Sequence, residues 1–95
     1  MANRHSFDVE KANLDEACRA LRWFTLARRG ANRKSGMLAI ERANAVCERM
    51  KKLFATGPYA LRVASILASV RGRILAAEAR LKLLALKATV GNESL

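Results

Sequence analysis

The chain has 95 residues, of which 52% are hydrophobic, and its 18 lysines and arginines against 8 acidic residues give a net charge of +10. This length forms one domain, residues 1–95, with a modest core, and the hydrophobic fraction excludes disorder by composition. One proline and five glycines, together with more alanine and leucine than β-branched residues, predict an all-α fold.

The positive charge indicates an anionic partner, such as nucleic acid, an acidic protein surface or lipid headgroups. Charge alone does not choose among these partners, and the same excess also keeps a protein soluble. The N-terminus shows no secretory signal. Charged residues also break the most apolar stretch, residues 59–88, before it reaches the roughly 20 apolar residues of a membrane span. We therefore expect a cytoplasmic protein.

A first helix is predicted over residues 7–29, with Ser6 as its cap. Helical spacing gives it a core face made of Phe7, Leu14, Ala17, Cys18, Leu21 and Phe24. Trp23 lies on a second, weaker apolar strip of the same helix. It is a candidate contact for a partner because tryptophan is enriched in binding hot spots; the alternative is that it packs over the protein's own core.

A polar connection with four positive charges follows, at Arg28, Arg29, Arg33 and Lys34. Ser35 is predicted to cap the next helix, and the open amide groups at a helix start suit an anion. These four cations are therefore the best candidates for binding phosphate. The alternative is a solvated turn without a ligand.

The second helix is predicted over residues 36–55 and stops before Gly57 and Pro58. Its expected core face is Ile40, Ala43, Cys47, Met50 and Phe54, widened by Ala39, Val46 and Leu53.

The longest helical pattern, residues 59–88, predicts a third helix of about 45 Å, followed by a frayed tail at residues 90–95. Its core face is Val63, Leu67, Val70, Ile74, Ala77, Leu81 and Leu84. A row of small residues consists of Ala60, Ala64, Ala68, Gly72 and Ala76. The row either lets another helix approach closely or reflects only the helix propensity of alanine, and Gly72 is a candidate bend.

Short connections make neighbouring helices antiparallel, which predicts a three-helix assembly. In the first hairpin Cys18 and Cys47 fall at the same height on the two apolar faces, so we expect them to be neighbours. A disulfide needs Cα atoms within about 7 Å, closer than the usual 8–10 Å between helix axes. We therefore expect two buried thiols in a reducing compartment.

In the second hairpin the end of the third helix, Arg80 to Lys87, extends beyond the second helix. Its leucines point in several directions, and an uncovered apolar surface of this kind indicates an interface. We predict a homodimer, a protein partner or both, bound through Leu81, Leu83, Leu84 and Leu86. The basic connection is expected beside them, where it suits a partner with an acidic rim.

Nucleic-acid binding is the alternative. Arg73, Arg80 and Lys87 share one edge of the third helix and would contact phosphates together with the basic connection. No recognition motif and no face of several aromatic residues accompanies them. A helix lying on a membrane surface is the least favoured interpretation.

The sequence offers little for catalysis. It has one histidine, His5, and two cysteines whose spacing is unlike that of a zinc site. It contains no glycine-rich phosphate loop and no nucleophile beside a base. We predict no catalytic residue, metal or cofactor, and expect a non-enzymatic protein that docks on a partner and modulates it.

Overall fold

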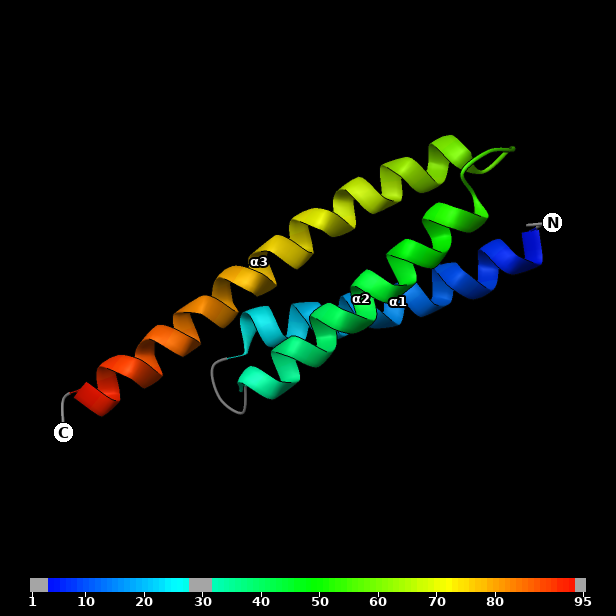
Figure 1. Cartoon of the computed structure of the whole chain (residues 1–95). Helices are drawn as coiled ribbons and strands as arrows, with labels where there is room; N and C mark the ends of the chain where they lie inside the picture. Colours follow the sequence, from blue (N-terminus) through cyan, green and yellow to red (C-terminus); the bar gives the residue numbers. More distant parts are fainter. Residues whose placement is uncertain (1–3, 28–31, 94–95) are drawn as a thin grey trace.

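The structure is a computed structural model that describes residues 4–27 and 32–93, with side chains up to Lys87. Three helices make up this part of the chain: α1 (Arg4–Leu26), α2 (Arg33–Leu53) and α3 (Ala60–Glu93). The described residues form no strand, so the predicted all-α class is confirmed. Each helix packs against both others, and consecutive helices run in opposite directions (Figure 1).

The core lies along the line where the three helices meet. The residues buried there are Phe7, Leu14, Ala17, Leu21, Phe24, Ala39, Ala43, Val46, Met50, Phe54, Val63, Val70, Ile74 and Ala77. All of them were expected on the inner faces from their spacing. Six residues predicted for those faces, Cys18, Ile40, Cys47, Leu67, Leu81 and Leu84, are partly buried and pack against this core, whereas Leu53 is exposed.

Two of the predicted helix starts were wrong. The first helix begins at Arg4, so Ser6 lies inside its first turn. The second begins at Arg33, with Asn32 and not Ser35 as its cap. The Asn32 side chain accepts a hydrogen bond from the Ser35 backbone N–H at 2.9 Å, and the Asn32 N–H donates to Ser35 Oγ at 3.3 Å. This reciprocal pair satisfies two donors, which favours the earlier start.

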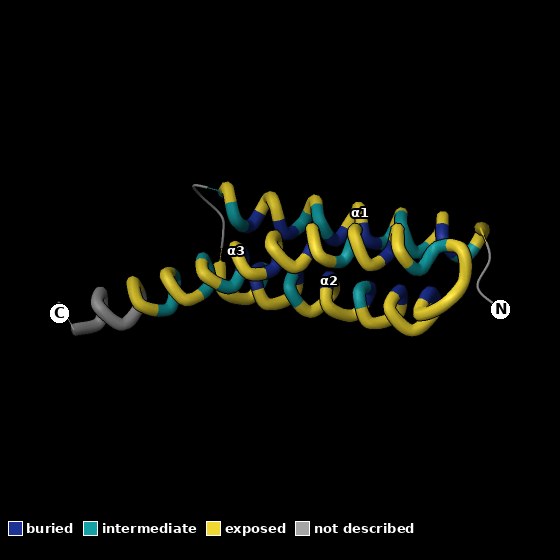
Figure 2. The backbone as a smooth tube through the Cα atoms, turned by 90° about the horizontal axis from the view of Figure 1, so that it is seen from above, coloured by how far each residue is buried: buried dark blue, intermediate teal, exposed yellow. Residues whose placement is uncertain are grey.

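The third helix is continuous through Gly72 and runs to Glu93, past the tail predicted from residue 90. No proline interrupts this segment, and Gly72 lies within one uninterrupted helix. Much of α3 is exposed along its length, and its C-terminal end projects beyond α1 and α2 (Figure 2). The expected overhang is therefore present.

Aromatic packing holds the opposite end of the bundle together. The Phe7 ring stacks on Tyr59 with ring centroids 4.7 Å apart, and Phe54 meets Phe7 edge to face at 5.7 Å. The Arg62 guanidinium lies 4.9 Å from the centre of the Phe7 ring, a cation–π contact. Gly57, with φ of +96°, makes the turn that brings these residues together, because this conformation favours glycine.

Candidate functional site

The overhanging end of α3 lies beside the start of α2. Leu84, Asn32, Arg33 and Lys34 line a shallow surface pocket of about 540 Å³. Arg33 and Lys34 are exposed, whereas Leu84 is half-buried. The structure thus brings two of the four cations of the predicted anion site next to a predicted partner-binding leucine. Arg28 and Arg29 lie outside the described residues.

The four leucines of the overhang divide into two pairs. Leu81 and Leu84 pack against the core of the chain, so they also stabilise the fold. Leu83 and Leu86 are 55% and 60% exposed. Apolar side chains at this exposure are the ones that a partner could cover, so the exposed pair is the stronger candidate for contact.

Arg80 is engaged within the fold. Its guanidinium donates hydrogen bonds to the carbonyl oxygens of Thr25 at 3.2 Å and Ala27 at 2.7 Å, at the end of α1. Carbonyls at a helix end lack partners within the helix, and a cation there also complements the helix dipole. The side chain predicted to bind anions therefore joins α3 to α1.

The other predicted contacts are spread over the surface. Arg73 and Lys87 are exposed on either side of Arg80 along α3. Trp23 is 53% exposed on α1, so it does not pack over the protein's own core. Trp23 does not line the pocket at Leu84, so it is not part of the same site.

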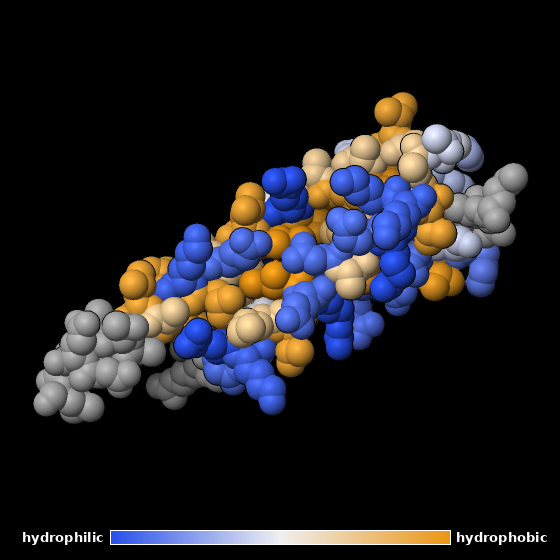
Figure 3. Space-filling model, viewed as in Figure 1, coloured by the Kyte–Doolittle hydropathy of each residue, from blue (hydrophilic) through white to orange (hydrophobic). Residues whose placement is uncertain are grey.

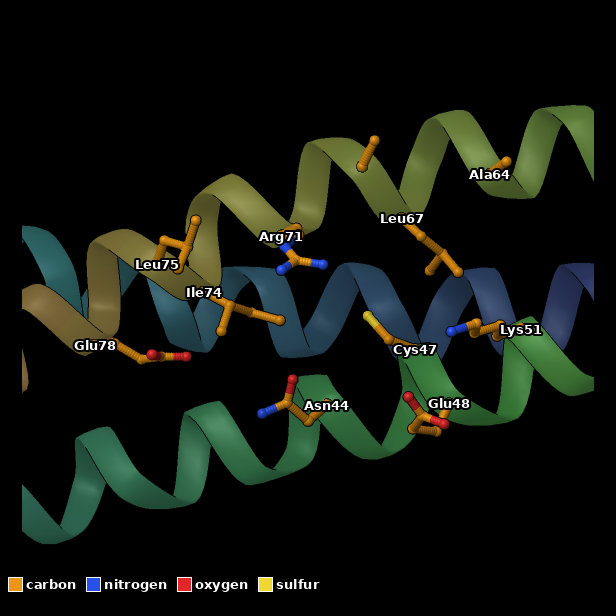
Figure 4. Close-up of a pocket in the computed structure, with 11 residues that line it drawn as sticks. Asn44, Cys47, Glu48, Lys51, Ala64, Leu67, Arg71, Ile74, Leu75 and Glu78 are labelled. Atoms are coloured by element: carbon orange, nitrogen blue, oxygen red, sulfur yellow. The ribbon is translucent and has the colours of Figure 1, made fainter.

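A second hollow, which was not predicted from the sequence, lies on the outside of the bundle in the groove between α2 and α3 (Figure 4). Its volume is about 680 Å³. Leu67, Ile74 and Cys47 form its apolar floor, and Arg71 reaches into it from α3 (Figure 4). Apolar surface runs through the middle of this face between polar side chains (Figure 3).

Leu61 and Leu75 are also exposed on α3, at 87% and 55%. Leu75 borders the hollow between α2 and α3. Neither leucine belongs to the core face predicted from sequence. Leu61, Ala68 and Leu75 recur at seven-residue spacing and could have predicted a second apolar side of this helix. Ala68 also belongs to the row of small residues at four-residue spacing, and it was interpreted only as part of that row.

Cys18 and Cys47 are free thiols, both partly buried. Burial raises the pKa of each thiol. Arg73 opposes the increase in the pKa of Cys18, and the nearby Cys18 raises the pKa of Cys47 further. The protonated thiol is a weak nucleophile and a weak metal ligand. We therefore interpret Cys18 and Cys47 as residues that pack against the core.

Within the part of the chain that the structure describes, no three His, Cys, Asp or Glu side chains come together as a metal site would require. No described helix contains an apolar stretch long enough to cross a membrane.

Comparison with known proteins gives no relative. No protein-family model, curated protein or solved structure matches the chain.

Proposed function

We propose that the protein is a non-enzymatic, self-associating binding protein that docks on a partner protein through the C-terminal part of α3 and modulates that partner. The observation that carries the proposal is the position of Arg33 and Lys34 around the apolar pocket at Leu84. An apolar contact surrounded by cations suits an apolar patch with an acidic rim on the partner.

The overhang also offers apolar side chains outside this pocket for docking. Leu83 and Leu86 are more than half exposed, and α3 extends past the two helices that cover its first half (Figure 1). Burying such side chains against a partner removes apolar surface from water, which is the main driving force of association. The free thiols of Cys18 and Cys47 are compatible with a reducing compartment such as the cytoplasm.

A photo-crosslinking amino acid at position 83 tests the proposal in the cells that make the protein. We expect a discrete protein adduct, identified by mass spectrometry, that is absent when the same probe replaces Leu38. Leu38 is a matched control because it is 57% exposed and lies on α2. Equal labelling from both positions, or adducts with nucleic acid alone, would exclude specific docking at this site.

Nucleic-acid binding through Arg33, Lys34, Arg73 and Lys87 is the second candidate. Two ion pairs occur among the described side chains, Lys11 with Asp15 and Arg49 with Glu10, so most of the positive charge is not neutralised internally. This function requires affinity for DNA or RNA that falls steeply as salt rises. The hydrogen bonds of Arg80 to the end of α1 weigh against it, because they occupy the central cation of the predicted edge.

A further inference from the structure

The side of α3 that faces away from the core is itself apolar. Counting 100° per residue, six positions fall within about 30° of one line along the helix, opposite Val63, Val70 and Ala77. We call these positions the outer stripe: Leu61, Ala68, Gly72, Leu75, Ala79 and Leu86. All six are exposed, and the stripe contains no charge.

A helix that is apolar on two opposite sides normally has a neighbour on each side. Among the described residues, α1 and α2 cover the core side of α3, and nothing covers the outer stripe. Gly72 has no atom within 4 Å of a Cβ built on it, apart from its own helix backbone and chain neighbours. The stripe therefore has room for another helix at close range.

The stripe is symmetric about the midpoint between Arg73 and Ile74. Leu61 and Leu86 are equally far from this point, as are Ala68 and Ala79, and Gly72 and Leu75. A second α3 could lie antiparallel on this stripe, with a twofold axis passing through the midpoint. Each Leu75 would then face the partner's Gly72 beside the axis. Small residues would meet beside that pair, and leucines would meet at both ends. At the axis the large Leu75 would lie opposite the small Gly72, the alternation that lets facing helices interdigitate.

Two of the charges beside the stripe, those of Arg71 and Glu78, fit the same arrangement. Arg71 and Glu78 lie on the α2 side of α3, where both line the hollow between α2 and α3 (Figure 4). Neither makes an ion pair within the described residues. In the antiparallel arrangement the same edges of the two helices adjoin, so Arg71 of each copy lies nearly level with the partner's Glu78. Two intermolecular ion pairs result, whereas a parallel pair separates these charges by about two turns.

We infer that the occupant of the outer stripe is a second copy of this chain, bound antiparallel through α3 and centred between Arg73 and Ile74. The contact from Leu61 to Leu86 is about 38 Å long at 1.5 Å per residue. This inference specifies the self-association within the proposed function. It shares Leu86 with the docking surface, but it leaves Leu84, Arg33 and Lys34, which line the pocket at the start of α2, free to contact the partner.

Sedimentation analysis over a wide concentration range tests this interface. The wild-type protein should form a dimer, and Leu75→Asp should weaken it by ~100-fold or more, because a charge would be buried beside the twofold axis. Leu38→Asp is the control, since Leu38 has nearly the same exposure, 57% against 55%, on α2. Circular dichroism establishes that both variants keep their helices.

Charge exchange tests the antiparallel register. Arg71→Glu and Glu78→Arg should each weaken the dimer by about tenfold. Each substitution replaces both intermolecular ion pairs with two like charges side by side. The double variant should recover most of the affinity. Arg33→Glu with Lys34→Glu should leave the dimer unchanged, which separates this interface from the docking site. A chain that stays monomeric throughout, a dimer indifferent to Leu75→Asp, or a double variant without rescue would overturn the inference.

Discussion

Arg80 of α3 donates a hydrogen bond of 2.7 Å to the carbonyl oxygen of Ala27, just past the end of α1. The two residues are 53 positions apart in the chain. The same guanidinium also reaches the carbonyl of Thr25 at 3.2 Å. The overhanging part of α3 is thus fixed to α1 at the point where it begins to leave the bundle. A rigid helix presented in this way is a better platform for binding than a mobile one.

Removing this link should loosen the same end of the bundle. Arg80→Ala leaves two helix-end carbonyls without their donor, and we expect the free energy of unfolding to fall by about 1–3 kcal/mol. Urea denaturation measures the loss. Arg42→Ala, at an exposed position of α2, is the control and should stay within about 0.5 kcal/mol of wild type. Equal effects of the two substitutions would show that the hydrogen bonds of Arg80 contribute nothing.

The glycines of α2 and α3 should respond in opposite ways to substitution by alanine. A Cβ at Gly36 would overlap the ring of Phe24, which is fully buried and cannot easily move. Gly36→Ala should therefore destabilise the fold by about 1–3 kcal/mol. Gly72→Ala meets nothing in the monomer and should stabilise it by up to about 1 kcal/mol, because alanine favours helix. Thermal unfolding at low protein concentration compares them, and the same sign at both positions would refute the packing described for Gly36.

The two thiols should make folding stability depend on pH in the alkaline range. Burial raises the pKa of Cys18 and Cys47 in the folded state, so an unfolded chain loses these protons first. The contribution of the protonated thiols to the free energy of unfolding is therefore fully present below the ordinary thiol pKa. It is lost as pH rises through the raised pKa values of the folded state. Replacing both cysteines by serine should remove that part of the decline, measured by urea unfolding across the range.

Alkylation supplies a second measurement on the same thiols. The folded protein should react with iodoacetamide several-fold more slowly than the unfolded protein near neutral pH, because the thiolate is the reactive form. Arg73→Ala should slow Cys18 further, since Arg73 lowers the pKa of that thiol. Faster reaction in the folded state would contradict the environment described for these residues.

Charge reversal at the start of α2 tests the role of the basic rim. Arg33→Glu with Lys34→Glu places acids in the first turn of a helix, where they suit the dipole, so the fold should be kept. Docking of an acidic-rimmed partner should weaken by about tenfold or more, seen as loss of cross-linking from position 83. Arg19→Glu with Arg22→Glu makes the same change of charge at exposed positions of α1 and should have little effect. Equal losses from both pairs would indicate attraction by net charge alone.

The helical core could be predicted from the sequence because burial follows local periodicity. Residues such as Phe24, Met50 and Val70 recur at the spacing of one helix face, and they are the buried ones. The helix boundaries were less accurate where two signals competed. Asn32 and Ser35 are both good caps, and only the reciprocal hydrogen bonds between them identify Asn32 as the first.

The candidate site could be predicted only in part, because it depends on contacts between distant residues. The overhang followed from helix lengths, and its position beside Arg33 and Lys34 followed from the antiparallel order. The engagement of Arg80 did not follow, since nothing local distinguishes it from Arg73 or Lys87. The outer stripe was also missed, because a small residue such as Gly72 or Ala79 looks the same at a contact and on a bare helix surface.

The most direct test of the whole account is light scattering coupled to size-exclusion chromatography on nuclease-treated protein, at low and moderate salt, alone and with added DNA or RNA. We expect a species of twice 10.5 kDa that does not co-elute with nucleic acid at either salt concentration. A monomer of 10.5 kDa that carries nucleic acid at low salt and releases it at moderate salt would contradict the account.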